Sequence, residues 1–228
     1  MNALGSILEF IFPRQCHICG VTLGDTERYI CATCLSRMPR TLFHRQPDNA
    51  MEQRFMGQFP YRQATGHFFY SRGSELAVLM HDLKYHRFPG LARYLGEVVA
   101  TELLPTGFLS DIDVVVPVPM HPLKQARRGY NQTIEIARGI SRVTSIEVAQ
   151  NLRAVKSHRT QTSMTLEQRL KNTQGVFGVR RPDELDGKGV LLIDDVCTTG
   201  ATLSAAATAL TEACPNIELS LLTLGVTF

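Results

Sequence analysis

Several features are missing from this chain of 228 residues, and each absence excludes a class of protein. No apolar run approaches the roughly 20 residues that a membrane-spanning helix needs, so we expect no transmembrane segment. The start, MNALGSILEFIFPRQC, has neither a basic segment nor a small-residue cleavage site before the cysteines, unlike a signal peptide. We therefore expect a mature cytoplasmic protein.

Two common nucleotide-binding motifs are also absent. No Gly-x4-Gly-Lys-Ser/Thr run is present, which excludes a Walker P-loop, and no Gly-x-Gly-x-x-Gly follows a strand pattern, which excludes a Rossmann dinucleotide site. Apolar residues make up 44% and charged residues 20%, as in an ordinary globular protein. The length is enough for one sizeable α/β domain with a small appendage.

Charge is unevenly distributed along the chain. The net charge is +3, but residues 116–181 hold 12 Lys and Arg against 3 Glu and no Asp, a local balance of +9. A solvated basic face would account for this stretch. A binding site for a polyanion would account for it equally, and the ligand would be a phosphorylated small molecule, a nucleic acid, or both.

Four of the six cysteines form two Cys-x-x-Cys pairs near the start, CHIC and CATC, separated by 11 residues. Each pair can turn two thiolates toward one ion, and two pairs complete a tetrahedral S4 site that suits Zn²⁺. Disulfides would need an oxidising compartment, and a redox motif normally occurs once beside a βαβ unit. We therefore predict structural zinc, with His17 as an alternative ligand inside the first pair. The predicted zinc ligands are Cys16, Cys19, Cys31 and Cys34.

The rest of the chain alternates helical and strand patterns, which predicts a mostly parallel open sheet. We expect helices at 75–86, 90–104, 131–142 and 201–213. We expect strands at 111–116, 176–179, 190–193 and 219–226. Three prolines predict an extended loop over 117–133, and the polar stretch 155–171 is expected to be an excursion from the fold.

The stretch VLLIDDVCTTGAT, residues 190–202, carries the sharpest chemical signal. The carboxyl end of a buried parallel strand lies at the rim where open α/β sheets bind ligands, and Asp194 and Asp195 follow that strand. The next helix start offers unpaired N–H groups to a phosphate, with threonine hydroxyls beside them. The two acids could accept hydrogen bonds from two vicinal hydroxyls, and the helix start could bind one phosphate. Together they fit a ribose 5-phosphate.

Gly200 has no Cβ, so we expect a ligand phosphate to approach the backbone there. On this interpretation Gly200→Val blocks the phosphate without touching the core and barely changes the melting temperature. Cys197 and Cys214 lie outside the four-cysteine group, and we expect Cys214 to be a core or helix-end residue.

This motif resembles the phosphoribosyl pyrophosphate (PRPP) motif of type I phosphoribosyltransferases. With the two Cys-x-x-Cys pairs, LMHDLKYH, VPVPMHPLKQARRGYNQT and HRTQTSMTLEQRLKNTQGVFGV, nearly the whole chain resembles the ComF family of competence-associated proteins. The resemblance implies a zinc-ribbon-like module at 1–45 and a type I phosphoribosyltransferase domain at 46–228. It also implies a role in DNA uptake, with single-stranded DNA and the uptake machinery as partners.

The resemblance further implies roles for individual residues. Asp194 and Asp195 would hold the ribose and be the catalytic residues, one of them as general base, with Mg²⁺ bound alongside PRPP. The 5-phosphate would lie on Thr198, Thr199, Gly200, Ala201 and Thr202. The diphosphate would lie on the loop 117–122, with Pro119 and Met120, and would be neutralised by Lys124, Arg127 and Arg128.

The residues leave the reaction open. One interpretation is Mg-dependent phosphoribosyl transfer to an unknown acceptor, with release of diphosphate and catalysis mainly by positioning and charge stabilisation. The alternative is a non-catalytic module that binds PRPP or single-stranded DNA, in which the basic stretch contacts phosphates and Tyr130 stacks on a base. The same arginines serve both interpretations.

Overall fold

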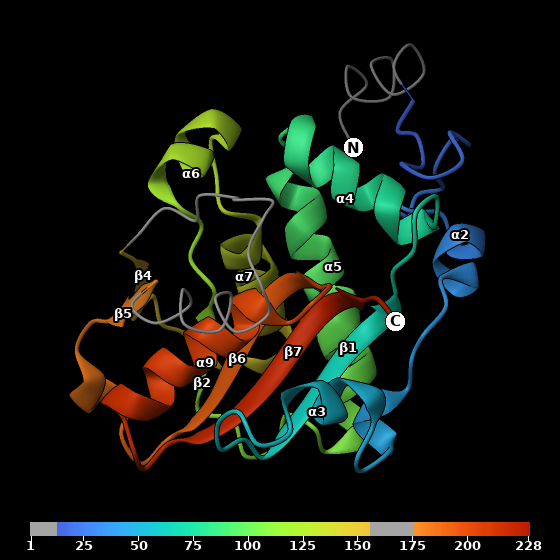
Figure 1. Ribbon diagram of the computed structural model, residues 1–228. Coiled ribbons are helices and arrows are strands. Elements are labelled where there is room, and N and C mark those ends of the chain that lie inside the picture. Colours follow the sequence, from blue (N-terminus) through green and yellow to red (C-terminus); the bar gives the residue numbers. More distant parts are fainter. Residues whose placement is uncertain (1–12, 156–175) are drawn as a thin grey trace.

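The computed structural model describes residues 13–155 and 176–228 (Figure 1). The apolar start and nearly all of the polar excursion expected at 155–171 lie outside these residues.

A five-stranded parallel sheet forms the centre of the fold. Its spatial order is β1-β7-β6-β2-β3, and every neighbouring pair is parallel. The strands are β1 (Gln63–Phe69), β7 (Glu218–Val226), β6 (Gly189–Cys197), β2 (Val114–Pro117) and β3 (Glu147–Val148). This confirms the predicted α/β class with a mostly parallel open sheet.

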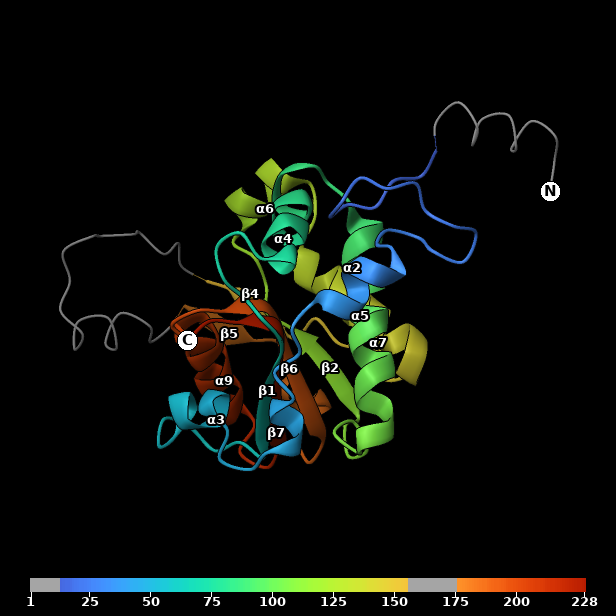
Figure 2. The same cartoon turned by 90° about the vertical axis from the view of Figure 1, so that its right-hand side faces the viewer.

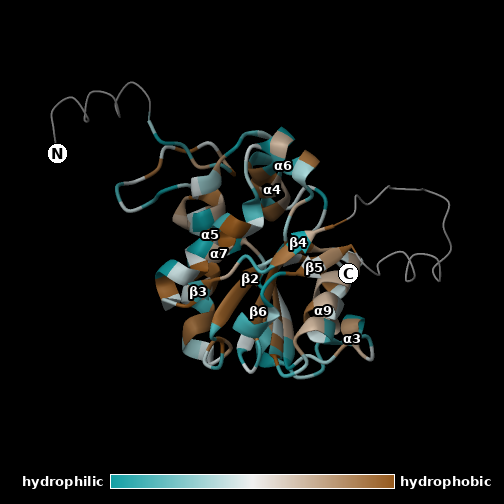
Figure 3. Ribbon diagram, turned by 90° about the vertical axis from the view of Figure 1, so that its left-hand side faces the viewer, coloured by the Kyte–Doolittle hydropathy of each residue, from teal (hydrophilic) through white to brown (hydrophobic). Residues whose placement is uncertain are grey.

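Helices cover both faces of this sheet (Figure 2). Successive strand residues point to opposite faces, so Val115 and Leu191 pack on one side while Val114 and Val190 pack on the other. The first face is covered by α4 (Glu75–Tyr85), α5 (Pro89–Leu103) and α7 (Gln132–Thr144). The second is covered by α3 (Ala50–Phe55) and α9 (Ala201–Ala213). The strands are correspondingly apolar between the two helical layers (Figure 3).

The expected helices are all present. Ser74 caps α4 by accepting a hydrogen bond from the backbone N–H of Ala77, and Asn131 caps α7 through Thr133. The expected second helix ends at Leu103 and continues as the short η2 (Leu104–Thr106).

The extended loop predicted over 117–133 is wrong in part, because α6 (Pro122–Arg128) forms inside it. Proline is favoured in the first turn of a helix, where its missing N–H needs no partner, and Pro122 occupies that position. The His121 side chain accepts from the backbone N–H of Leu123, and Gly129, with φ +82°, ends the helix. The basic residues Lys124, Arg127 and Arg128 therefore lie on a helix.

The predicted strand at 190–193 is too short, because β6 continues to Cys197. The strand expected at 111–116 begins only at Val114. The one expected at 176–179 is β5 (Phe177–Val179), which pairs antiparallel with β4 (Leu152–Ala154) in a separate two-stranded sheet. Other elements not predicted include the short helix at Ala32–Arg37 and the elements β1, β3, β4, α3, η1 (Phe43–Arg45) and η3 (Pro182–Glu184).

The cysteine-rich segment packs directly on the first helical layer. Cys31 caps α2 (Ala32–Arg37), and Cys16, Ile30 and Met38 belong to the same buried cluster as Leu79 of α4. Contacts of this kind place the segment beside α4 and α5 (Figure 1).

Candidate functional site

The two acids lie where strand β6 extends beyond its neighbour β2. The last β2–β6 pair is Pro117 with Ile193, whereas Asp194 still pairs with Thr223 of β7. Asp194 and Asp195 are thus strand residues rather than residues just after a strand. The chain leaves β2 through α7 toward β3 and leaves β6 through α9 toward β7, in opposite directions. Such a switch point opens a crevice at the carboxyl ends of the strands, where open α/β sheets bind ligands.

A cavity of about 420 Å³ fills this crevice. Both acids line it, as do residues of the β2–α6 loop, α6, the start of α7, the β4–β5 hairpin and α9. From the predicted site residues the cavity brings together Asp194, Asp195, Thr202, Pro119, Met120, Lys124 and Arg128.

Asp195 has two partners from other elements. The Gln132 Nε2 atom at the start of α7 donates to Asp195 Oδ2 over 2.7 Å, and Lys84 Nζ of α4 lies 3.8 Å from the same oxygen. Gln132 is only 3% exposed, and its Oε1 atom finds no hydrogen-bond partner among residues 13–155 and 176–228. A buried acceptor normally has a partner, so this oxygen is suited to a ligand O–H or N–H group in the cavity.

The paired carboxyl groups perturb each other. Desolvation, followed by the negative charge of Asp195, raises the pKa of Asp194 to about 8, against weaker opposing contributions from Lys84 and from a hydrogen bond with Thr133. Burial and the neighbouring carboxylate thus favour the protonated form of Asp194. A cation or a cluster of hydroxyl donors would favour the ionised pair.

The loop from Thr198 to Thr202 forms a second, smaller cavity of about 30 Å³ beside Asp194. Thr198 and Thr199 are exposed, and α9 starts at Ala201 with no side-chain cap. The smaller cavity is lined by Asp194, Val196, Cys197, Thr198, Thr199, Gly200, Ala201, Thr202 and Leu203.

The reason for glycine at position 200 differs from the predicted one. Gly200 is buried with φ +82°, and an added Cβ would lie 2.9 Å from Phe55 Cε1 of α3. The glycine thus allows the turn and its packing against α3, so the expectation that Gly200→Val leaves the fold undisturbed is wrong. The Arg54 guanidinium supports the same loop by donating to the Thr198 carbonyl over 2.5 Å and to the Thr227 carbonyl over 2.6 Å.

The predicted basic residues divide between two neighbouring depressions. Arg127 does not line the cavity with the acids. It lines an adjacent groove of about 420 Å³, together with Lys84, Tyr85, Arg87, Lys124 and Arg128. Tyr85 is 68% exposed there. Among the described residues no carboxylate forms a salt bridge with Lys124, Arg127 or Arg128, so their charges are available to an anion.

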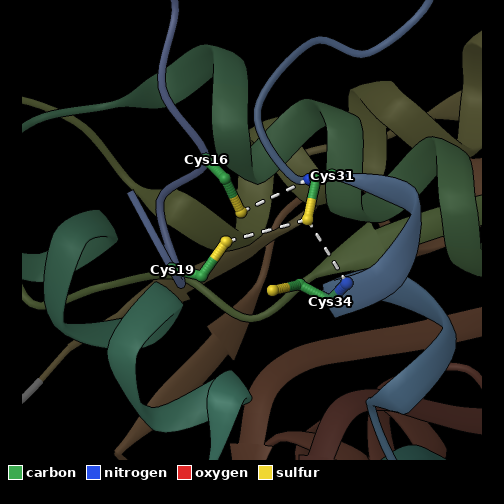
Figure 4. A group of neighbouring side chains, drawn as sticks. All are labelled: Cys16, Cys19, Cys31 and Cys34. Atoms are coloured by element: carbon green, nitrogen blue, oxygen red, sulfur yellow. Dashed lines mark hydrogen bonds between the residues drawn. The ribbon is translucent and has the colours of Figure 1, made fainter. Parts of the chain in front are cut away.

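The four N-terminal cysteines converge on one point (Figure 4). Their sulfur atoms all lie within 4.8 Å of one another, and Cys19 Sγ is 3.8 Å from Cys31 Sγ. Zn–S bonds of about 2.3 Å place the sulfurs of a tetrahedral site about 3.8 Å apart, whereas a disulfide needs about 2.05 Å. The cluster therefore fits a tetrahedral metal ion.

Backbone N–H groups donate hydrogen bonds to two sulfur atoms of this four-cysteine cluster. The Cys31 backbone N–H donates to Cys16 Sγ over 3.3 Å, and the Cys34 N–H donates to Cys31 Sγ over 3.4 Å. Burial opposes ionisation of Cys16, but backbone N–H groups, first that of Cys31, outweigh it and lower the pKa of Cys16 to about 6. His17 points elsewhere, toward Asp82, so it is not a member of the cluster.

The other two cysteines are buried and lie outside the four-cysteine cluster. Cys214 is the C-cap of α9 and is 1% exposed, as predicted. Burial raises the pKa of Cys197, and its thiol lies 3.4 Å from Arg54.

Sequence reasoning missed Lys84, Gln132 and Arg54. Lys84 and Gln132 lie in the stretches LMHDLKYH and RGYNQT. The helical pattern of these stretches does not indicate that either side chain contacts Asp195. A usable signal for Gln132 was a run of polar residues, Asn131 to Thr133, at the start of an amphipathic helix beside a phosphate motif. Arg54 precedes the sheet and carries no motif.

Comparison with known proteins agrees with this geometry. Residues 111–224 match the family model described as phosphoribosyl transferase domain. Competence protein F of Haemophilus influenzae is 34% identical over 94 residues, covering 40% of this chain and 41% of that protein. DNA utilization protein YhgH of Escherichia coli K12 is 28% identical over 133 residues, covering 57% and 58% respectively. Competence protein ComFC of Bacillus subtilis is 29% identical over 99 residues, covering 43% and 38%.

The chain belongs to the phosphoribosyltransferase domain family. Within it, the curated relatives and the N-terminal four-cysteine cluster place the chain in the ComF/YhgH group. The matched segments span only about two fifths to three fifths of those relatives. A solved structure of glutamine PRPP amidotransferase from Bacillus subtilis is similar at a TM-score of 0.39 and 22% identity, covering 57% of this chain and 25% of that one. No helix in the described part of the chain is long and apolar enough to cross a membrane.

Proposed function

We propose that this chain binds PRPP, or a related ribose phosphate, in the crevice between β2 and β6. The ribose hydroxyls would hydrogen-bond to Asp194 and Asp195, since carboxylates accept from vicinal hydroxyls. The 5-phosphate would lie in the small cavity formed by residues 198–202, on the N–H groups at the start of the 13-residue helix α9.

The diphosphate would occupy the larger cavity. Pro119 and Met120 shape its wall, while Lys124 and Arg128 supply positive charge that no carboxylate of the described residues pairs with. Lys84 of α4 adds a third cation, next to Asp195. Three cations around one cavity suit the charge of a diphosphate leaving group.

The donor set also suits Mg²⁺, which prefers carboxylate and phosphate oxygens. Asp194 and Asp195 would hold the ion together with the ligand, and Mg²⁺ would supply charge neutralisation of the diphosphate. The residues of the chain then fix the ribose, stabilise the departing diphosphate through Lys84, Lys124 and Arg128, and can accept a proton at Asp194 or Asp195. We propose that the phosphoribosyl group is transferred to an acceptor and that diphosphate is released.

A single observation carries this proposal: two adjacent acids follow the last β2–β6 pair at a switch point of the sheet, and a small cavity lies directly beside them. Isothermal calorimetry of the full chain with PRPP and Mg²⁺ tests it. Saturable binding that ribose 5-phosphate weakens by competition supports the proposal. Absence of binding at millimolar ligand contradicts it. Release of diphosphate in the presence of candidate acceptors then separates transfer from binding alone.

We further propose that the four-cysteine cluster of residues 16–34 holds one structural Zn²⁺ within a module of residues 1–45. The sulfur separations and the N–H···S hydrogen bonds support a closed tetrahedral site. All four positions would be filled by protein, so this ion would have no open position for chemistry.

A second candidate function is binding of single-stranded DNA, in keeping with the names of the relatives. It is supported by the basic groove next to the cleft, where exposed Tyr85 stands among Lys84, Arg87, Arg127 and Arg128. Backbone phosphates would pair with the cations while a base stacks on the ring, an arrangement that tolerates any sequence. The predicted stacking residue Tyr130 is unsuited, because it is partly buried and its hydroxyl donates to the Leu83 carbonyl over 2.6 Å.

Oligonucleotide binding measured at several salt concentrations tests this second function. Affinity should fall steeply with salt, and Arg127→Ala with Arg128→Ala should flatten the slope by about two counterions. Arg62→Ala, at an exposed pair with Asp111, serves as the matched control. Binding that is absent at low salt, or a slope unchanged by the double variant, contradicts it. Competition between PRPP and oligonucleotide would indicate adjoining sites.

A further inference from the structure

The last turn of α4 lies between the four-cysteine cluster and the crevice between β2 and β6, which is called the cleft below. His17, located inside the first Cys-x-x-Cys pair, places its Nδ1 atom 2.7 Å from Asp82 Oδ2 on this turn. Both side chains are only 16% exposed. The His17 ring also meets Phe88 edge to face, with ring centres 4.7 Å apart. The cysteine-rich segment is therefore attached to the end of α4 through a specific polar contact.

The same turn carries a lysine into the cleft. Lys84 follows Asp82 by two residues, lines both the cavity and the basic groove, and lies 3.8 Å from Asp195 Oδ2. A movement of this turn by an ångström would move the Lys84 ammonium relative to the acids, because both residues share one turn of helix.

Other contacts on the turn do not replace the contact from His17. His86 Nδ1 lies 2.9 Å from Asp82 Oδ1, but it belongs to the same helix end and moves with it. Tyr130, just before α7, donates to the Leu83 carbonyl over 2.6 Å and fixes the backbone of the turn. Asp82 is thus oriented from outside the helix by His17.

We infer that Lys84 is a ligand-binding residue of the cleft and that His17 and Asp82 are positioning residues which make its place depend on the cysteine module. This inference rests on the proposed binding of PRPP. It gives the zinc-binding segment a role in ligand recognition, although the metal site itself is closed. Lys84 would contact the anionic, diphosphate part of the ligand, since its ammonium stands at the border of the cavity and the basic groove.

The structure supplies a matched control for a purely structural role. Arg28 of the same segment forms an ion pair with Glu97 of α5 and lies over the Tyr94 ring, 4.8 Å from its centre. Neither Arg28 nor Glu97 lines the cavity or the groove. Arg28→Ala should therefore loosen the module without moving Lys84.

The test is a double-mutant cycle in the full-length, metal-containing protein, read as PRPP affinity by calorimetry. Lys84→Ala and His17→Ala should each weaken binding, by roughly 10-fold and 3-fold or more, and His17→Ala should cost almost nothing further in the Lys84→Ala background. Asp82→Asn should reproduce His17→Ala. His17→Asn, whose Nδ2 can occupy the position of the imidazole Nδ1, should restore affinity. Metal content measured on each variant verifies that the cluster is retained.

A ligand-free measurement separates this inference from the proposed function. The NMR signal of ¹³C-dimethylated Lys84, assigned with Lys84→Arg, should shift in His17→Ala and Asp82→Asn and stay in place in Arg28→Ala. A protein that fails to bind PRPP but shows this pattern retains the coupling and loses the proposed ligand. The inference would be overturned by any of three results. These are equal shifts in all three variants, an unmoved Lys84 signal in His17→Ala, or additive losses of PRPP affinity in the double-mutant cycle.

Discussion

Gln132 and Asp195 are joined by a hydrogen bond of 2.7 Å between residues 63 positions apart in the sequence. It connects the start of α7 to the carboxyl end of β6, across the switch point of the sheet. The bond fixes one carboxylate oxygen, while the buried Gln132 Oε1 has no hydrogen-bond partner within the part of the chain that the structure describes. We expect a ligand in the cavity to contact the same amide that orients Asp195.

Gln132→Leu keeps the side-chain size and removes both functions of the amide. A lost hydrogen bond to a charged group costs about 1.5–3 kcal/mol, so PRPP affinity should fall roughly 10- to 150-fold in calorimetry. Asn216→Ala removes an exposed hydrogen bond from the side-chain amide to Asp186, and this variant should bind PRPP as the wild type does. Unchanged affinity in Gln132→Leu would show that the amide does not take part in recognition.

Gly200→Ala should destabilise the protein even without a ligand. A left-handed φ costs an L-residue about 1–2 kcal/mol, and crowding against Phe55 adds about 1–3 kcal/mol. Gly187→Ala is the matched control, since Gly187 has φ +70° but no atom within 4 Å of an added Cβ. Urea unfolding should therefore show a clearly larger loss for Gly200→Ala, and equal losses would refute the packing explanation.

Cys31→Ser should abolish metal binding. Protein purified without added metal should contain about one zinc per chain by elemental analysis, and the variant close to none, while Cys214→Ser keeps the wild-type content. Because Cys16, Ile30 and Met38 share a buried cluster with α4 and α5, chelation should also lower the melting temperature of the whole chain. Metal-free wild-type protein would rule out the zinc site.

Glu102 provides a pH-dependent contribution to stability. Burial opposes its ionisation, but hydrogen bonds from His67 and Arg40 outweigh this and lower the pKa of Glu102 from 4.5 to about 2. Since the folded pKa is the lower one, the contribution is present above pH 4.5 and is lost as the pH falls toward 2. With allowance for solvent screening it amounts to about 1–2 kcal/mol.

Urea unfolding between pH 7 and pH 3 measures this contribution. Glu102→Gln should be less stable at pH 7 and should lose less stability on acidification than the wild type. Glu212→Gln, at an exposed position of α9, should keep the wild-type profile. Parallel profiles for Glu102→Gln and the wild type would exclude the contribution.

The sequence allowed prediction of the elements whose signals are local. Local patterns of about a dozen residues are enough to predict these elements. They are the apolar run of β6, the alanine-rich α9, and the capped helices α4 and α7. Strand β1, QATGHFF, lacks such a pattern and is a strand because β7 pairs with it along its length. The short α3 and β3 likewise depend on the tertiary contacts that surround them.

The sequence allowed prediction of most residues that gather at the candidate site, but not of the contacts between them. Two acids followed by a threonine-rich turn at a strand end favour a ribose phosphate site, and the structure places these residues around two neighbouring cavities. The positions of Lys84 and Gln132 depend on how α4 and α7 pack on the sheet. This packing could not be predicted from the spacing of residues in the sequence. The role of Gly200 was misjudged for the same reason, since Phe55 reaches it from α3, 145 positions earlier in the chain.

PRPP-induced thermal stabilisation of the wild type, Asp195→Asn and Asp186→Asn tests the central claim most directly. Asp195→Asn keeps the size and removes the charge in the cleft, while Asp186→Asn removes an exposed acid elsewhere. At about 100 times its Kd a ligand stabilises by about 2.7 kcal/mol, so the wild type and Asp186→Asn should show a clear rise in Tm with PRPP and Mg²⁺. Asp195→Asn should show little or none. An equal response of all three proteins would contradict the assignment of the crevice between β2 and β6 as the PRPP site.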